Sequence, residues 1–142
     1  MMNKQQDGFT LIEIMVVVVI LGILGALIVP NIMGRTGEAR ATATQSDIRA
    51  IGSALNLYRL DNFNYPTTDQ GLEALVNKPG GAPEAKNWNP DGYLPKLPKD
   101  PWGNDYLYLS PGTHGAYDLY SHGADGKEGG EETDRDILSW EL

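Results

Sequence analysis

The sequence contains no cysteine, so a disulfide bond, a thiolate nucleophile and a cysteine zinc site are all excluded. Positive charge is scarce, because 11 Lys and Arg residues stand against 19 Asp and Glu residues and give a formal net charge of −8. A surface that binds nucleic acid through its phosphates is therefore disfavoured. The sequence also lacks a G-x-S-x-G nucleophile elbow and a Gly-rich phosphate loop. We expect neither an enzyme nor an ATP-binding protein.

A long apolar run dominates the N-terminal part of the chain. No residue from Ile14 to Val29 is charged, and residues 9–29 would extend about 31 Å as a helix, which matches a bilayer core of about 30 Å. A cleaved secretory signal fits poorly, because the run is too long and Val29-Pro30-Asn31 offers no small-x-small site. A plain single-pass anchor leaves Glu13 unexplained, since a charge in hydrocarbon costs about 2.5–3.5 kcal/mol.

The stretch "GFTLIEI" followed by a Val/Ile/Leu run and Pro30 resembles the type IV pilin and pseudopilin signature. The resemblance implies cleavage between Gly8 and Phe9 by a membrane peptidase, removal of residues 1–8 as a leader, and N-methylation of Phe9. It also implies a filament-core helix over residues 9–29. The new amine at Phe9 can pair with Glu13 of an adjacent subunit, so we interpret Glu13 as the residue that sets the register of assembly.

Pro30 follows the apolar run and is our third assembly residue. It lacks a backbone N–H and removes a helical bond to Ala26, so the helix is expected to kink or open near Gly22, Gly25 and Pro30. The alternative is that the helix ends at Pro30.

Helical periodicity resumes beyond Pro30. Ile48, Ile51, Leu55 and Tyr58 fall at i, i+3, i+7 and i+10 and form one apolar stripe. We therefore predict a single helix of about fifty residues, far above the usual length, with a membrane-spanning first half and an amphipathic second half.

The remaining chain predicts a small α+β head. Thr67 and Gln70 have the spacing of a capping box before a short helix, which the prolines and glycines from Pro79 stop. The stretch from Gly80 to Gly103 is rich in Pro and Gly with interspersed aromatics, which is typical of an irregular loop held by packing. "DYLYLS" and "AYDLYS" flank "PGTHG" and predict an antiparallel hairpin.

A second resemblance covers most of this head. "YPTTDQGLEAL", "LPKDPWGNDYLYLSPG" and "YDLYSHGADG" resemble the major pseudopilins of the type II secretion system. Many type IV pilins instead close a C-terminal loop with a disulfide, so the absence of cysteine favours the pseudopilins. The resemblance implies a single-pass protein of the bacterial inner membrane whose head, residues 30–142, lies in the periplasm.

The same resemblance implies a function and partners. Copies of the chain would polymerise into a periplasmic pseudopilus that supports export of folded proteins across the outer membrane. The implied partners are minor pseudopilins, a prepilin peptidase and methyltransferase, and an inner-membrane assembly platform with its ATPase.

The segment from Ser121 to Trp140 is strongly acidic and glycine-rich. Repulsion of its carboxylates favours a solvated tail. The apolar "ILSW" behind it argues for docking, and a docked acidic loop needs a hard cation such as calcium. The spacing does not match an EF-hand. The acidic residues are Asp125, Glu128, Glu131, Glu132, Asp134 and Asp136.

The calcium ligands follow from the family resemblance. It implies the carboxylates of Asp125 and Asp136 together with the backbone carbonyls of His122 and Lys127. Asp134 is a further candidate and Glu132 a possible one. Two alternative functions stay open: a membrane-tethered calcium-binding module that never polymerises, and a type IV pilus subunit.

Overall fold

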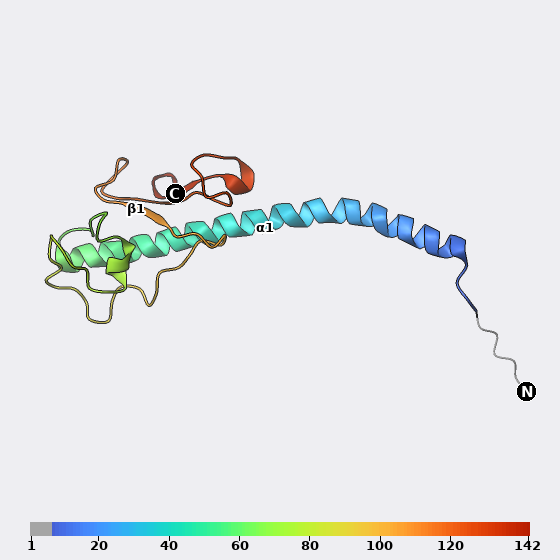
Figure 1. The fold of residues 1–142 in the computed structure, drawn as a ribbon. Helices are drawn as coiled ribbons and strands as arrows, with labels where there is room; N and C mark the ends of the chain where they lie inside the picture. Colours follow the sequence, from blue (N-terminus) through green and yellow to red (C-terminus); the bar gives the residue numbers. More distant parts are fainter. Residues whose placement is uncertain (1–6) are drawn as a thin grey trace, which may run out of the picture. The chain divides into compact units, whose positions relative to one another are not determined.

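The computed structural model describes residues 7–142, except the side chains of residues 30–33. Its order is one long α-helix followed by short elements (Figure 1). The chain divides between Thr36 and Gly37 into two compact units. From here on "the head" means the second unit, residues 37–142, and the head boundary at residue 30 stays a prediction. The predicted α+β class is confirmed. The elements are α1 Leu11–Asn62, η1 Leu72–Leu75, β1 Leu107–Leu109, β2 Asp118–Ser121, η2 Glu132–Asp134, β3 Ile137–Leu138 and η3 Ser139–Glu141.

Helix α1 is 52 residues long and is continuous through Pro30. A proline removes one backbone hydrogen bond, which a long helix tolerates, so the alternative in which the helix ends there is wrong. The helix contains a window with a mean hydropathy of 3.0, none of which is buried, so it is long and apolar enough to cross a membrane. The expected kink and the assembly role of Pro30 stay predictions, since that side chain lies outside those described.

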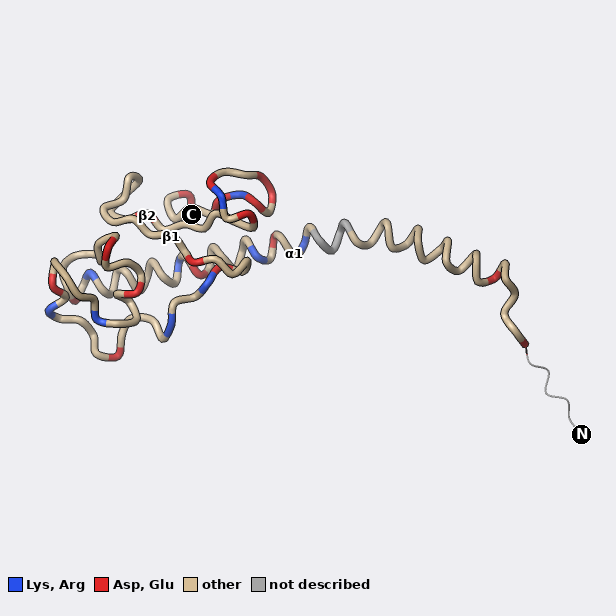
Figure 2. The backbone as a smooth tube through the Cα atoms, viewed as in Figure 1, with Lys and Arg blue, Asp and Glu red and all other residues tan. Residues whose placement is uncertain are grey.

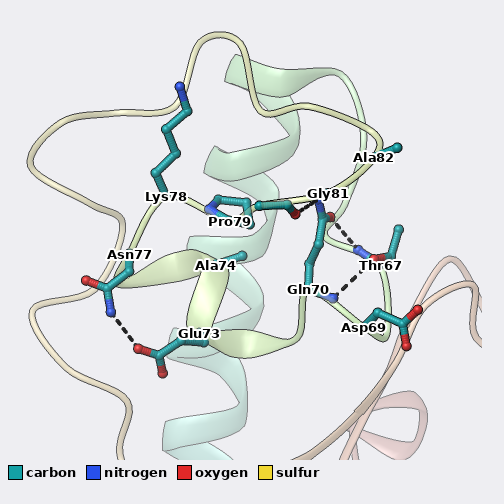
Figure 3. Close-up of a pocket in the computed structure, with 11 residues that line it drawn as sticks. Thr67, Asp69, Gln70, Glu73, Ala74, Asn77, Lys78, Pro79, Gly81 and Ala82 are labelled. Atoms are coloured by element: carbon teal, nitrogen blue, oxygen red, sulfur yellow. Dashed lines mark hydrogen bonds between the residues drawn. The ribbon is translucent and has the colours of Figure 1, made fainter.

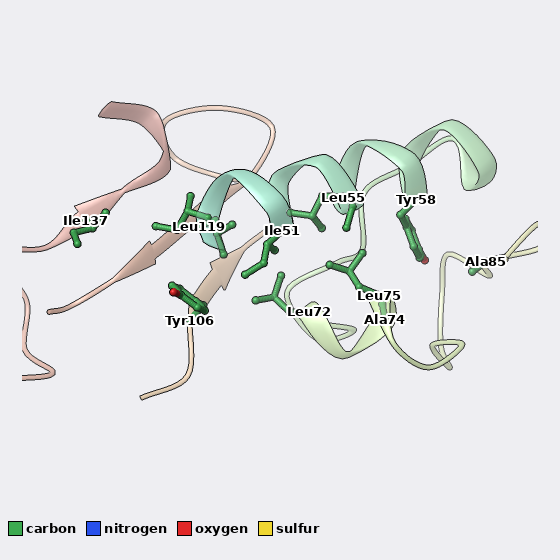
Figure 4. Close-up of a cluster of buried hydrophobic side chains, with 12 residues drawn as sticks. Ile51, Leu55, Tyr58, Leu72, Ala74, Leu75, Ala85, Tyr106, Leu119 and Ile137 are labelled. Carbon is green, nitrogen blue, oxygen red and sulfur yellow. The ribbon is translucent and has the colours of Figure 1, made fainter. Parts of the chain in front are cut away.

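The second half of α1 supplies one side of the head's core. Ile48, Ile51, Leu55 and Tyr58 are all buried, which confirms the predicted stripe (Figure 4). Burial of each such side chain contributes about 1.5–3 kcal/mol. Every member of the buried cluster lies within the head, so the head has a core of its own: Ile48, Ile51, Ala54, Leu55, Tyr58, Leu72, Ala74, Leu75, Ala85, Tyr106, Leu119 and Ile137.

The predicted short helix after the first loop is a 3₁₀ helix, η1. Its capping box is present: Thr67 N donates to Gln70 Oε1 at 3.0 Å, and Gln70 N donates to Thr67 Oγ1 at 3.2 Å. The next residue, Gly71, has a φ of 64°, which interrupts the helical path. The box therefore closes a single turn, and η1 begins only at Leu72.

The loop from Gly80 to Gly103 is irregular and held by aromatic side chains, as predicted. Trp88 Nε1 donates to Ala74 O at 2.8 Å, and the Trp88 ring meets Tyr93 edge-on at 6.0 Å. The Tyr93 hydroxyl donates to Asp61 Oδ2 at 2.8 Å near the end of α1. These contacts tie the loop to the helix.

The sheet has three antiparallel strands in the order β1-β2-β3. The predicted hairpin is confirmed, with Tyr108 opposite Leu119. β3 was not predicted as a strand; it pairs Ile137 with Ser121 and docks the chain that follows the acidic loop. The hydroxyl of Tyr106, the residue before β1, donates to Asp47 Oδ2 on α1 at 2.8 Å, and this bond joins the start of the sheet to the helix.

Candidate functional site

The predicted cleavage bond lies immediately before α1. Gly8 and Phe9 have no regular secondary structure, and the Phe9 side chain is 80% exposed. A Cβ at Gly8 would meet no atom within 4 Å, so the backbone is open to approach. The bond is therefore accessible to a peptidase. Residues 1–6 of the predicted leader lie outside the described residues.

Glu13 has a contact that sequence reasoning missed. Thr10 is the residue before α1, and Glu13 N donates to Thr10 Oγ1 at 3.2 Å while Thr10 N donates to Glu13 Oε2 at 3.4 Å. This pair is a capping box, and the spacing "TLIE" in the sequence is its signal. Glu13 thus caps its own helix, in addition to the pairing with a neighbouring amine predicted above.

The acidic loop closes on itself between β2 and β3. Asp136 links both ends of this closure: its Oδ1 lies 3.2 Å from His122 Nδ1, and its Oδ2 accepts the N–H of Gly129 at 2.9 Å. Ala124 N also donates to Thr133 O at 3.0 Å. Red acidic residues follow this loop in Figure 2. The solvated-tail alternative is therefore wrong, because the loop is folded and its apolar end is docked.

Two glycines allow the loop to close tightly. Gly123 has a φ of 69°, and a Cβ there would stand 2.8 Å from Arg135 O. Gly130 has a φ of 101°, and a Cβ there would stand 2.5 Å from Asp134 O. Any larger residue would push the two sides of the loop apart.

A buried hydrogen-bond network fixes the start of the loop. Ser121 Oγ donates to Asp100 Oδ2 at 2.8 Å and accepts the N–H of Gly123 at 3.2 Å. The other oxygen of Asp100 accepts the N–H groups of Trp102 at 3.1 Å and Asn104 at 2.8 Å. Asp100 lies in the loop from Gly80 to Gly103, so this loop holds Ser121, the residue before His122, in place. Sequence analysis did not identify Asp100, since a lone Asp before Pro carries no distinctive signal.

The predicted calcium ligands occupy one loop but do not meet at one point. Asp125 Oδ1 accepts the N–H of Lys127 at 3.0 Å, and Asp136 bonds His122 and Gly129. Asp134 is the last residue of η2. In the described chain, no three acidic or histidine side chains form a cluster. The donors are oxygen atoms on a closed loop, and this donor chemistry fits calcium.

A surface hollow lies beside η1 (Figure 3). Its volume is about 490 Å³, and Thr67, Gln70, Glu73, Asn77 and Lys78 line it. Four of these residues bond one another: Thr67 and Gln70 form the capping box, and Asn77 Nδ2 donates to Glu73 Oε1 at 2.6 Å. Neither hydroxyl nor carboxylate here is paired with an imidazole, so the hollow has none of the geometry of nucleophilic catalysis.

Comparison with known families matches both parts of the chain. Residues 31–140 match the family described as "Type II secretion system (T2SS), protein G". Residues 3–29 match the prokaryotic N-terminal methylation motif.

Individual relatives agree with these matches. A type II secretion system core protein G of Pseudomonas aeruginosa is 65% identical over 141 residues, which cover 99% of each chain. The core protein G of Vibrio cholerae is 56% identical over 98% of this chain and 94% of the relative.

A solved structure gives the same result for the fold. The crystal structure of the major pseudopilin from the type 2 secretion system of enterohaemorrhagic Escherichia coli is 48% identical. It superposes with a TM-score of 0.70 and covers 80% of this chain and 96% of that chain. These relatives are structural subunits, which confirms that the chain is not an enzyme. The chain therefore belongs to the protein G family of the type II secretion system, the family of major pseudopilins.

Proposed function

We propose that this chain polymerises into the periplasmic pseudopilus of a type II secretion system and so supports the export of folded proteins across the outer membrane. Family membership supports this function. The structural observation that carries it is the first half of α1, whose large apolar side chains from Leu11 to Val29 are exposed. The head already has its own core, so these side chains need either lipid or further copies to cover them.

The N-terminal segment would change its surroundings during assembly. As a newly made subunit, the chain crosses the inner membrane once through residues 9–29, with its head in the periplasm. Cleavage after Gly8 then frees the Phe9 amine, which pairs with Glu13 of a neighbouring copy as the helices leave the lipid. An exposed apolar helix serves both stages, because lipid tails and packed helices are equally apolar surroundings.

Several partners are required by this sequence of events. A prepilin peptidase and methyltransferase would process the Gly8–Phe9 bond, in keeping with the methylation motif. Since the chain has no phosphate loop, the energy for assembly must come from an ATPase that acts through an inner-membrane platform. Minor pseudopilins are the expected partners at the filament end.

Imaging of filaments sheared from cells that overproduce the full-length chain, beside cells with normal expression, tests this function. Filaments composed of protein that begins at Phe9 support it. Processed protein that remains dispersed in the membrane would instead support the membrane-tethered alternative. Filaments that extend outside the cell at normal expression would support a type IV pilus subunit.

We also propose that the acidic loop binds one calcium ion. The expected ligands are the carboxylates of Asp125, Asp136 and Asp134 with the carbonyls of His122 and Lys127, and Glu132 is a possible addition. The bonds that close the loop around Asp136 support this proposal, because they hold acidic residues together where their charges repel. The ion would supply positive charge that offsets this repulsion. Elemental analysis of the purified head tests for it.

A further inference from the structure

The first residue of the head, Gly37, is a buried position on an otherwise exposed stretch of α1. Residues 34–36 and 38–40 are exposed, whereas Gly37 is buried. A Cβ at Gly37 would stand 2.5 Å from Thr133 Cγ2 in the acidic loop. A Cβ at Gly34, about one turn earlier, would meet no atom within 4 Å. The methyl group of Thr133 thus occupies the space that a side chain at residue 37 would fill.

Gly37 also begins the face by which α1 packs on the rest of the head. Ala41 and Thr44 follow at i+4 and i+7 on the same side of the helix. Ala41 packs against the core cluster, and Thr44 is fully buried. Glycine is unfavourable in the interior of a helix. The close approach of Thr133 gives a physical reason for a glycine at this position.

The loop holds Thr133 in place from the other side. Thr133 O accepts the N–H of Ala124 at 3.0 Å, and Asp134 N donates to Glu131 O at 3.0 Å. Glu132, directly before Thr133, has a φ of 54°, a left-handed conformation that strains a residue other than glycine. Such strain persists only where the surrounding contacts maintain it. Threonine is also stiff at χ1, so its methyl group cannot swing away as the end of a long side chain could.

We propose that Thr133 latches the acidic loop onto α1 at Gly37. While the loop is closed, this contact holds the α1 residues from Gly37 to Thr44 against the head, and opening of the loop releases them. Coupling between two sites is reciprocal. A change at Gly37 should therefore loosen the loop, and a change at Thr133 should loosen the helix. The latch goes beyond the proposed function, since it requires neither polymerisation nor a bound ion.

Hydrogen exchange of the full-length chain in detergent micelles, with every variant in one buffer, tests the first direction. Gly37→Ala places a methyl group against Thr133 Cγ2 and leaves the loop sequence intact. The N–H of Ala124, which bonds to Thr133 O, should then exchange about fivefold faster or more, because the loop opens more often. Gly34→Ala is the matched control, since its methyl group meets no atom, and it should keep wild-type exchange in the loop.

Thr133→Ala tests the reverse direction, because it leaves the sequence of α1 intact. The amides from Gly37 to Thr44 should exchange about threefold faster or more, while those at the buried Leu55 keep their protection. The double variant Gly37→Ala, Thr133→Ala restores a contact. With Cγ2 removed, the added methyl group lies 3.9 Å from the Cβ of residue 133, which is ordinary van der Waals contact. The double variant should therefore regain most of the loop protection that Gly37→Ala loses.

Four results would overturn the latch. Wild-type loop exchange in Gly37→Ala would show that the close approach does not hold the loop. An equal loss of protection in Gly34→Ala would assign the effect to the helix in general. A double variant no better protected than Gly37→Ala would show that the loop opens for another reason. Unchanged α1 exchange in Thr133→Ala would mean that the helix does not depend on the loop. Because no filament is measured, failure of the proposed function would leave this test intact.

Discussion

The imidazole of His114 stacks on the indole of Trp140, with ring centroids 3.9 Å apart and planes 3° from parallel. His114 lies in the hairpin turn and Trp140 lies in η3, so the stack joins the hairpin to the C-terminal segment. Asp118 holds the turn in place: its carboxylate accepts the N–H groups of Thr113 at 2.9 Å and His114 at 3.1 Å.

Asp118 should make the head sensitive to acid. Burial alone would raise its pKa, but hydrogen bonds from Thr113 and His114 outweigh burial and lower the pKa to about 2. Because the folded pKa is depressed, the stabilisation is present above the usual value of 3.8 and is lost as pH falls toward about 2. Asp118→Asn should cost about 1–3 kcal/mol at neutral pH. Thermal melts of the head from pH 7 to pH 2 measure this, and the variant should lose less stability than wild type below pH 4. If wild type and Asp118→Asn lost the same stability between pH 7 and pH 2, the role given to Asp118 would be contradicted.

Gly8→Val should block processing. A branched side chain beside the scissile bond prevents close approach of the peptidase to a backbone that is otherwise open. We expect unprocessed precursor to accumulate in the inner membrane, as seen by mass spectrometry of membrane fractions. Asp7→Asn leaves the glycine in place and serves as the control. Normal amounts of mature protein that begins at Phe9 in Gly8→Val would disprove this prediction.

Glu13 has two proposed roles that can be separated. Glu13→Gln keeps a capping side chain for Thr10 N but removes the charge, whereas Thr10→Ala keeps the charge and removes the hydroxyl that caps Glu13 N. If the charge pairs with a neighbouring amine, Glu13→Gln and Glu13→Val should be processed yet assemble poorly, and Thr10→Ala should assemble. Filament counts after shearing measure this. The reverse ranking would mean that the cap, and not the charge, controls assembly.

Calcium removal should destabilise the head. Binding at about one hundred times Kd stabilises the folded state by about 2.7 kcal/mol, so a chelator should lower the melting temperature by roughly 10 °C or more. Asp125→Ala should reproduce this loss in the presence of calcium, while Glu128→Ala, outside the expected ligand set, should not. Magnesium should rescue poorly, because it demands a regular octahedral site. Identical melts with and without chelator, and no metal by elemental analysis, would rule out the site.

Gly130→Ala tests the closure of the loop without replacing any of the proposed ligands. The added methyl would stand 2.5 Å from Asp134 O and force the closed loop to open. We expect faster hydrogen exchange from Gly123 to Asp136, while the buried core at Leu55 keeps its protection. Exchange unchanged from wild type would show that the loop does not need this close approach.

The features predicted from sequence are those with a repeating pattern. The stripe from Ile48 to Tyr58 recurs with a helical period over three turns, and the hairpin combines alternation with a turn of Pro and Gly. β3 has only two residues, too few to alternate, so its pairing with β2 depends on tertiary contacts. The short helix predicted after Thr67 is present as η1, but its 3₁₀ form and its start at Leu72 depend on the left-handed Gly71, which the sequence pattern did not indicate.

The residues of the candidate site also fall into two groups: those with a local sequence pattern, which could be predicted, and those brought together only by the fold. Gly8, Phe9 and Glu13 belong to one contiguous motif and could be placed from sequence. The capping box of Thr10 and Glu13 also has a local signal, the three-residue spacing in "TLIE". The Asp100 and Ser121 network could not be predicted, since it joins residues 21 positions apart and neither has a distinctive neighbour.

The pairing of β2 with β3 has a consequence for biogenesis. β2 is the middle strand, and one of its two partners, Ile137–Leu138, is the last strand of the described chain. The sheet therefore stays incomplete during synthesis until residue 138 has emerged. Until then β2 presents an open edge of unpaired backbone groups to neighbouring nascent chains. A stalled or clipped subunit that lacks β3 would keep that edge and stay open to pairing with another chain.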